Sequence, residues 1–185
     1  RPLEMAVRMA VAGNIIDFGL DHHFREEVVN DVLERAAVSP VCGGFEGFVR
    51  DAAQASSILY LADNAGEIVF DRVLIEELGT HRVTVVVRGM PVLNDALRPD
   101  VVAAGIEGVE VIDNGSDAPG TILEDCSAEL RGRFADAEMV IAKGQGNYET
   151  LSDSPRPVWF VLMAKCAVIA RHIGCETGSF VLQKK

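Results

Sequence analysis

The sequence predicts an α/β fold with a doubly wound, mostly parallel sheet, helices on both faces and an additional N-terminal helical portion. Short apolar runs alternate with amphipathic helical patterns along the chain, as in successive strand–helix–strand units. Each apolar run ends in polar or charged residues, as strands do at the ligand-binding edge of such a sheet. A hydrophobic content of 49% in 185 residues is sufficient for one substantial core. We expect residues 1–56 to form the helical portion and residues 57–185 the α/β core.

The stretch from Ser57 to Leu78 is the clearest strand–turn–helix unit. It begins with a continuous apolar run at residues 58–61, which is typical of a strand that is covered on both faces. Asp63 and Asn64 follow, and from Ile68 to Leu78 apolar residues recur every three or four positions, which predicts an amphipathic helix. The turn therefore places two oxygen-bearing side chains at a helix N-terminus, where ligands bind in open α/β sheets.

The other elements follow from the same patterns. Leu3–Ala12 is predicted to be a largely buried helix, and Phe45–Ala55 a second helix. The Asp21-His22-His23 segment indicates a polar helix start, because adjacent histidines on a helix point in different directions. A later helix is expected from Ser127 to Phe134, with Ser127 as its N-cap. The further expected strands are Arg82–Val87, Val109–Ile112, Met139–Ala142, Val158–Met163 and an edge strand at Ser179–Leu182.

Charge and cysteine usage exclude several classes of protein. The formal net charge of −11, with no basic stripe to offset it, argues against nucleic-acid and anionic-membrane partners. The four cysteines are widely spaced and form no C-x-x-C pair, which argues against a zinc knuckle and favours a reducing, cytoplasmic location. No uncharged apolar run is long enough to span a bilayer. The sequence begins at Arg1-Pro2 without a methionine, which indicates a processed product or a fragment.

Polar residues at the strand ends are the candidate site. If the strands are parallel, one cleft at their carboxyl edge receives the side chains that follow them: Asp63, Asn64, Arg88, Asn114, Lys143 and Lys165. Asp63, Asn64 and Asp95 carry hard oxygen ligands, which suit Mg²⁺ or Mn²⁺ better than a thiolate-preferring metal. From the Asp63-Asn64 dipeptide alone, however, an ordinary helix cap is the favoured interpretation.

Lys143 opens a second segment of interest, K-G-Q-G-N. Its glycines let backbone N–H groups approach an anion, and a lysine at a strand end can hold a phosphate oxygen. The segment has neither the P-loop order nor the dinucleotide-binding order of glycines, so it is a weak nucleotide motif. On its own, a glycine turn is the more common explanation.

Together these segments resemble a known family. The stretches AGNIIDFG (Ala12–Gly19), LADNAGEIVFD (Leu61–Asp71), LND (Leu93–Asp95) and AKGQGNYETL (Ala142–Leu151) are similar, in the same order, to the metal-dependent damage-control phosphatases, formerly domain of unknown function 89. The resemblance runs through almost the entire chain and implies a Rossmann-like core. Members of that family usually carry an additional, mostly helical N-terminal segment, and this chain begins just before its G-N-I-I-D block.

The resemblance also implies roles for individual residues. Asp63, Asn64 and Asp95 would hold a divalent metal ion, namely Mn²⁺, Mg²⁺, Co²⁺ or Ni²⁺, and Lys143 would lie at the phosphate site. Asp63, Asn64 and Lys143 would then be the catalytic residues. Substrate contacts would come from Asn14, Asp17, Glu67, Arg88, Asn114 and Lys143.

We therefore expect a metal-dependent phosphatase that hydrolyses small phosphorylated metabolites, such as sugar phosphates or phosphorylated cofactor intermediates. The attacking group is either a metal-bound water or the Asp63 carboxylate acting as a nucleophile. Two alternatives stay open: an S-adenosylmethionine-dependent methyltransferase, whose glycine-rich first loop is missing here, and a non-catalytic metal- or metabolite-binding module. The physiological substrate, the metal and the oligomeric state do not follow from the sequence.

Overall fold

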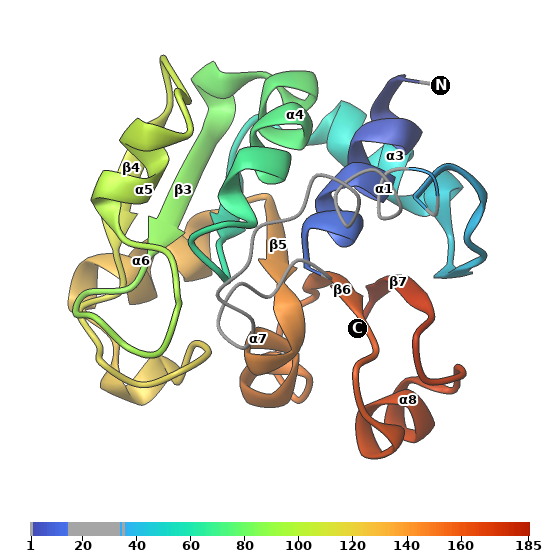
Figure 1. The fold of residues 1–185 in the computed structure, drawn as a ribbon. Coiled ribbons are helices and arrows are strands. Elements are labelled where there is room, and N and C mark those ends of the chain that lie inside the picture. Colours follow the sequence, from blue (N-terminus) through green and yellow to red (C-terminus); the bar gives the residue numbers. More distant parts are fainter. Residues whose placement is uncertain (1, 15–33, 35) are drawn as a thin grey trace.

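The computed structural model describes residues 2–14, 34 and 36–185, and it confirms the predicted α/β class (Figure 1). Within this part of the chain, seven strands form one sheet in the order β1-β7-β6-β5-β2-β3-β4. The strands are β1 (Val41–Gly43), β2 (Ile58–Leu61), β3 (Val83–Val87), β4 (Glu110–Asp113), β5 (Met139–Lys143), β6 (Trp159–Met163) and β7 (Phe180–Lys184). The strands from β2 to β6 run parallel, whereas β7 is antiparallel to β6.

Helices cover both faces of the sheet, as expected. They are α1 (Pro2–Gly13), α3 (Phe45–Gln54), α4 (Ile68–Leu78), α5 (Arg98–Ala103), α6 (Ala128–Asp136), α7 (Gly144–Leu151) and α8 (Ala167–Ile173). One core lies between the sheet and α1, α3, α4 and α5, and the other lies between the sheet and α6, α7 and α8. Alternate residues of β2 point into the two cores, since Ile58 and Tyr60 face the first and Leu59 and Leu61 the second.

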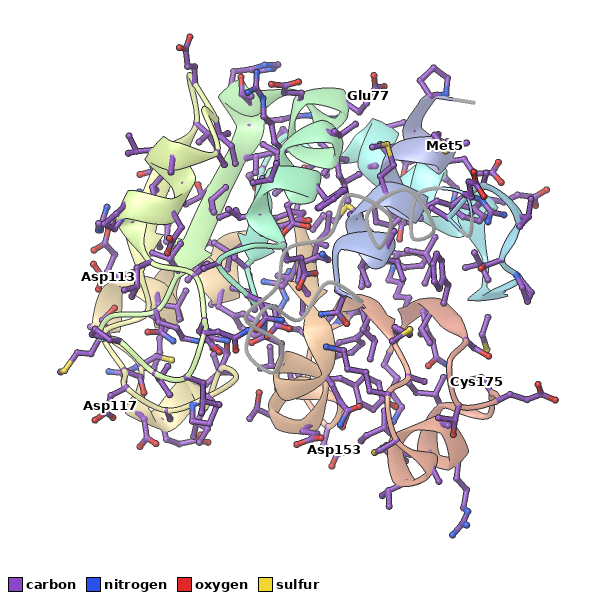
Figure 2. All side chains as sticks on the ribbon, viewed as in Figure 1. Met5, Glu77, Asp113, Asp117, Asp153 and Cys175 are labelled. Atoms are coloured by element: carbon purple, nitrogen blue, oxygen red, sulfur yellow. The ribbon has the colours of Figure 1, made fainter. Side chains whose placement is uncertain are left out.

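The polar surface lies outside these two cores. Glu77, Asp113, Asp117 and Asp153 lie at the periphery of the molecule (Figure 2). Among the helices of residues 2–14 and 36–185, none is long and apolar enough to cross a membrane.

The strand order places a topological switch point between β2 and β5. After β2, the chain continues to β3 and β4 on one side, and then returns to place β5 and β6 on the other. Ligands of open α/β sheets bind at the carboxyl ends of the strands at such a point. Asp63 follows β2 by two positions, and Lys143 is the last residue of β5, so both lie at this point.

Several predicted elements hold and others need correction. Ser127 caps α6, because its hydroxyl oxygen accepts a hydrogen bond from Leu130 N at 3.1 Å. The segment Val41–Gly43, where the sequence predicted no strand, is strand β1, which pairs with β7. The predicted edge strand β7 is therefore internal, and residues 1–56 contribute a strand as well as helices.

The glycine-rich segment after Lys143 is a helix rather than a turn. α7 begins at Gly144 and buries Tyr148 and Leu151 against the second core. Tyr148 packs edge-on against Phe160 of β6, with ring centroids 4.9 Å apart. These two apolar contacts compensate for the low helix propensity of two glycines in eight residues.

Candidate functional site

The backbone brings the three predicted metal ligands together. The loop after β2 pairs with the loop after β3 through an antiparallel bridge between Asn64 and Asp95. Two hydrogen bonds secure this pairing: Ala96 N donates to Asp63 O at 2.7 Å, and Ala65 N donates to Asn94 O at 2.8 Å. Asp95 is therefore held beside Asp63 and Asn64, although 31 positions separate Asn64 from Asp95 in the sequence.

Two amide groups orient the Asp63 carboxylate. Asn14 Nδ2 and Asn64 Nδ2 each donate to Asp63 Oδ2 at 3.1 Å. The same two nitrogens lie 2.8 Å and 3.4 Å from Glu67 Oε2. Because Oδ2 accepts both amide hydrogens, Asp63 presents Oδ1 to a ligand. Because the Asn64 nitrogen faces these two carboxylates, the Asn64 carbonyl oxygen is turned away from them.

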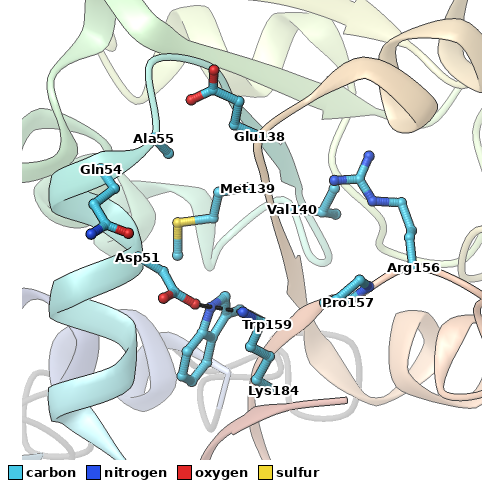
Figure 3. A pocket seen from close by; sticks show the side chains of 10 residues that line it. All are labelled: Asp51, Gln54, Ala55, Glu138, Met139, Val140, Arg156, Pro157, Trp159 and Lys184. Carbon is cyan, nitrogen blue, oxygen red and sulfur yellow. Dashed lines mark hydrogen bonds and ion pairs between the residues drawn. The ribbon is translucent and has the colours of Figure 1, made fainter.

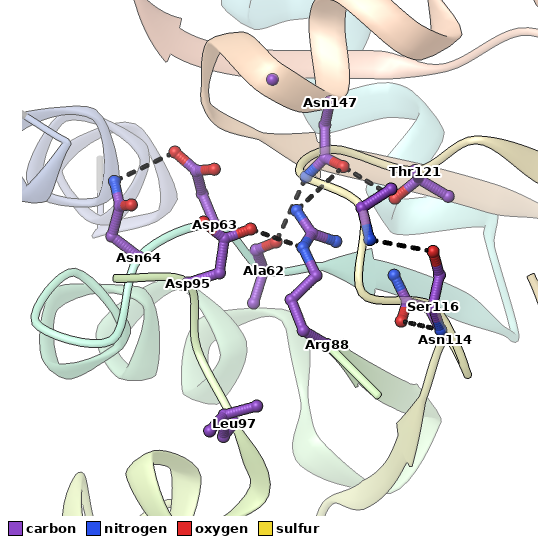
Figure 4. A network of polar contacts seen from close by, with 12 residues as sticks. Ala62, Asp63, Asn64, Arg88, Asp95, Leu97, Asn114, Ser116, Thr121 and Asn147 are labelled. Carbon is purple, nitrogen blue, oxygen red and sulfur yellow. Dashed lines mark hydrogen bonds and ion pairs between the residues drawn. The ribbon is translucent and has the colours of Figure 1, made fainter. Parts of the chain in front are cut away.

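Asp95 is held by a buried ion pair with Arg88, at 2.5 Å between Arg88 Nε and Asp95 Oδ2 (Figure 4). Arg88 Nη2 reaches Asn147 Oδ1 at 3.5 Å, while Arg88 Nη1 has no hydrogen-bond partner among the described residues. Asn114 Oδ1 accepts hydrogen bonds from Gly89 N at 2.8 Å and Ser116 N at 3.0 Å, but Asn114 Nδ2 has no partner in the same part of the chain. Buried donors are rarely left unsatisfied, so both nitrogens are candidates to bind an anionic ligand.

The electrostatics of the site favour a cation. Burial, followed by the carboxylates of Glu67 and Asp95, raises the pKa of Asp63 to about 7, although Arg88 and Lys143 oppose the shift. Four carboxyl groups lie in this cluster but only two basic side chains, and the residues are Asp63, Glu67, Asp71, Asp95, Arg88 and Lys143. A divalent cation would offset this excess directly.

The donor set fits a hard divalent ion. Mg²⁺ and Mn²⁺ prefer carboxylate and amide oxygens as ligands. The candidate ligands here are Asp63 Oδ1, the side-chain carbonyl oxygen of Asn64 and the Asp95 oxygen that does not accept from Arg88. No group of three His, Cys, Asp or Glu side chains is placed to hold a metal ion within residues 2–14, 34 and 36–185. The proposed set agrees with this finding, because it contains two carboxylates and its third ligand is an amide.

Lys143 lies beneath this site rather than open to it. Its side chain is fully buried, and Nζ donates to Ala10 O at 2.8 Å, to Asp71 Oδ1 at 2.5 Å and to Glu67 Oε1. Three acceptors satisfy all three hydrogens of an ammonium group. A direct contact between Lys143 and a phosphate remains a prediction, and it would require one of these hydrogen bonds to be exchanged.

Two site residues were not selected from the sequence. Asn147 lies on the first turn of α7, and Asn147 Nδ2 donates to Ala62 O at 3.2 Å and to Lys143 O at 2.8 Å, which ties β2 to β5. Asp71 is one of the charged residues between the apolar positions of α4, but it is fully buried. The signal for Asp71 was its spacing, because it lies one helical turn after Glu67 and so on the same face.

One predicted site residue lies outside the described residues, namely Asp17.

A pocket of about 260 Å³ lies away from the site, beside Met139 and Trp159 at the amino ends of β5 and β6 (Figure 3). At this pocket Asp51 accepts from Trp159 Nε1 at 3.0 Å and pairs with Lys184 at 2.7 Å. Asp63 and Lys143 lie at the opposite, carboxyl edge of the sheet, so the pocket is not part of the candidate site.

Gly144→Ala is expected to lower both metal affinity and stability. Gly144 has φ +76°, and a Cβ atom there would overlap Asp63 Oδ2. The backbone conformation alone costs an L-residue about 1–2 kcal/mol, and the overlap would also displace the Asp63 carboxylate. Gly174→Ala is the matched control, because Gly174 has φ +87° but no described residue within 4 Å of the added atom. We expect Gly174→Ala to lose only the backbone cost in urea, Gly144→Ala to lose more, and only Gly144→Ala to bind Mn²⁺ more weakly; equal Mn²⁺ affinities would contradict the proposed role of Asp63.

The stability of the metal-free protein should depend on pH through Asp71. Burial raises the pKa of Asp71 to about 7, Lys143 opposes this shift and Glu67 adds to it. A raised carboxyl pKa stabilises the fold below the unfolded-state pKa near 4, and this contribution is lost as the pH rises through about 7. Asp71→Asn should therefore gain stability relative to the parent protein between pH 5 and pH 8 in urea titrations. A difference that does not change with pH would contradict this prediction.

Comparisons with known proteins agree with the resemblance seen in the sequence. The model of the damage-control phosphatase ARMT1-like domain matches residues 1–181. A protein named damage-control phosphatase from Archaeoglobus fulgidus is 36% identical over 186 residues, which cover 97% of this chain and 64% of that protein. An uncharacterized protein from Methanocaldococcus jannaschii is 39% identical over 192 residues, which cover 99% of this chain and 63% of that protein.

A solved structure supports the fold across the whole chain. The crystal structure of a DUF89 family protein from Pyrococcus horikoshii superposes with a TM-score of 0.90 and 33% identity, and it covers 100% of this chain and 66% of that one. The chain thus spans less than two thirds of the length of the curated relatives it matches.

Proposed function

This chain belongs to the damage-control phosphatase ARMT1-like domain family, and from this premise we propose that it hydrolyses phosphate monoesters of small metabolites with the help of a divalent cation. One observation carries the proposal. Three oxygen ligands, from Asp63, Asn64 and Asp95, lie in one polar cluster with two buried nitrogen atoms, Arg88 Nη1 and Asn114 Nδ2, that have no hydrogen-bond partner among the described residues. The oxygens of such a cluster can bind a cation, and its nitrogens can bind the phosphate group whose charge the cation would neutralise.

Asp63, Asn64 and Asp95 would hold the cation, which supplies charge neutralisation at the phosphoryl group and a lowered pKa for a water molecule. Mn²⁺, Mg²⁺, Co²⁺ and Ni²⁺ all remain candidates. The role of Arg88 is twofold. It fixes the Asp95 carboxylate through Nε, and it offers Nη1 to a phosphate oxygen.

Asn114 supplies the second donor to the phosphate. Its carbonyl oxygen is anchored by the backbone N–H groups of Gly89 and Ser116, so Nδ2 is fixed without any rearrangement. Preorganised donors of this kind stabilise charge that develops in a transition state, and each contributes about 2.7–4 kcal/mol when water is excluded. Asn114→Ala should therefore lower kcat more than it raises KM.

Asp63 has two possible roles in the chemical step. Asp63 Oδ1 can attack phosphorus to form an acyl-phosphate and release the alcohol, after which water cleaves the acyl-phosphate to inorganic phosphate. Alternatively, Asp63 can orient the attacking water molecule. Trapping by hydroxylamine separates the two routes, because only the first route forms an acyl-phosphate. If an acyl-phosphate is trapped, a single turnover in ¹⁸O-labelled water shows which atom the water attacks: label in the Asp63 carboxyl group indicates the carbonyl carbon, and label in the phosphate indicates phosphorus.

The substrate class is tested by phosphate release from a panel of compounds. The panel contains sugar phosphates, phosphorylated cofactor intermediates and a generic aryl phosphate, each supplied with Mn²⁺. Release from metabolites at a higher kcat/KM than from the aryl phosphate is the expected result. Metal binding without release from any compound would favour a binding module and contradict the proposal.

A further inference from the structure

Asp71 is a buried carboxylate that the proposed chemistry does not use, and it lies one helical turn after Glu67. Glu67 and Asp71 are four residues apart at the start of α4, so both side chains lie on the same face of the helix. Both are fully buried, and both accept a hydrogen bond from Lys143 Nζ. Lys143 comes from β5, on the other side of the switch point.

The hydrogen bonds from Lys143 to Glu67 and Asp71 hold these three side chains in place. A buried carboxylate that loses its partner costs several kcal/mol, so neither Glu67 nor Asp71 can release the Lys143 ammonium cheaply. Ala10 O takes the remaining hydrogen at 2.8 Å and fixes the lysine from the side of α1. Lys143 therefore has one position, set by three acceptors from α1 and α4.

A continuous chain of polar contacts leads from this cluster to the metal ligands. Glu67 Oε1 accepts from Lys143, and Glu67 Oε2 accepts from the amide nitrogens of Asn14 and Asn64. The same nitrogens donate to Asp63 Oδ2. The position of Lys143 thus determines the position of Glu67, and Glu67 determines which oxygens of Asp63 and Asn64 remain available.

We propose that Asp71 is a positioning residue of the phosphatase site, which acts through Lys143 and Glu67 to turn Asp63 Oδ1 and the Asn64 carbonyl oxygen toward the cation. In this arrangement Lys143 needs no contact with the phosphate. The inference rests on the proposed function for its kinetic consequence. Its consequence for metal affinity can be measured without turnover.

The test compares Asp71→Asn with the parent protein. Residues that orient metal ligands typically contribute 10–100-fold to metal affinity or activity, so we expect the Kd for Mn²⁺ to rise about tenfold or more by calorimetry. We also expect kcat to fall about 10–100-fold with little change in KM, because the substrate donors Arg88 and Asn114 are not displaced. Glu77→Gln is the control, since Glu77 lies on the same helix but is exposed (Figure 2), and it should behave as the parent.

A double-mutant cycle tests whether Asp71 acts through Glu67. If it does, Asp71→Asn combined with Glu67→Gln should weaken Mn²⁺ binding no more than Glu67→Gln alone. Additive losses, or a folded Asp71→Asn with parental Mn²⁺ affinity, would overturn the inference. Asp71→Ser, which also lacks the charge, replaces Asp71→Asn if the latter does not fold. If the parent protein binds Mn²⁺ but releases no phosphate, the proposed function fails while the Mn²⁺ affinities still decide the role of Asp71.

Discussion

Asp63→Asn is expected to lower kcat for phosphate release by about a thousandfold or more while the protein stays folded. Asp63 supplies one of the two carboxylates of the proposed cation site and is also the candidate nucleophile. Replacing Asp63 by Asn removes a negative charge from the proposed cation site. Loss of one such group commonly lowers kcat by at least about 10²–10³-fold. The measurement is steady-state turnover of an aryl phosphate with saturating Mn²⁺, with the fold checked by circular dichroism.

The control for this variant is Asp153→Asn, which removes the same charge from an exposed position (Figure 2). It should retain parental turnover. Asp63→Asn should be at least as stable as the parent in metal-free buffer at pH 8, because it removes a carboxylate whose pKa burial raises to about 7. Parental turnover in a folded Asp63→Asn protein would remove Asp63 from the site.

Arg88→Met is expected to lower the free energy of unfolding by about 3–5 kcal/mol, because it leaves the buried Asp95 carboxylate without its partner. It should also weaken binding of inorganic phosphate, because the variant lacks the Nη1 donor. Urea denaturation measures the first effect and competitive inhibition by phosphate measures the second.

Arg98→Met is the matched control for Arg88→Met. Arg98 pairs with Asp113 at 2.9 Å, but both side chains are about half exposed, at 52% and 40%. Exposed pairs contribute about 0–1 kcal/mol, so Arg98→Met should lose no more than about that amount. Equal losses in the two variants would show that burial of the Arg88–Asp95 pair has no special effect on stability.

Much of the fold could be predicted because its central strands are apolar on both faces. β2 and β6 are uninterrupted apolar runs, and β3 and β5 each contain a single polar residue, Thr84 and Lys143. The lengths of these four strands were predicted to within one or two residues. β1 was missed because it has only three residues and lies between proline and glycine. The helix α7 was missed because its stability comes from Tyr148 and Leu151 packing on the second core, which a count of glycines does not reveal.

The candidate site could be predicted only in part from the sequence. Asp63 and Asn64 could be selected because they follow a strand end, and parallel strands end at the same edge of a sheet. Asp95 was selected through its carboxylate and the family resemblance of Leu93–Asp95. The spacing of Asp71 from Glu67 could have indicated that both lie on one face of α4, but it does not reveal their shared partner, because Lys143 arrives from β5. The glycine-rich segment of Lys143 predicted an open anion site, whereas three protein acceptors surround the ammonium group.

The most direct test of the account is phosphate release by metal-stripped protein before and after addition of a single divalent cation. With an aryl phosphate as substrate, we expect no release in the presence of chelator and restored release after Mn²⁺, Mg²⁺, Co²⁺ or Ni²⁺ is added. After metal addition, Asp63→Asn should release phosphate about a thousandfold more slowly than the parent, or slower still. Release that persists in chelator, or that Asp63→Asn carries out at the parental rate after metal addition, would contradict a phosphatase site built on Asp63, Asn64 and Asp95.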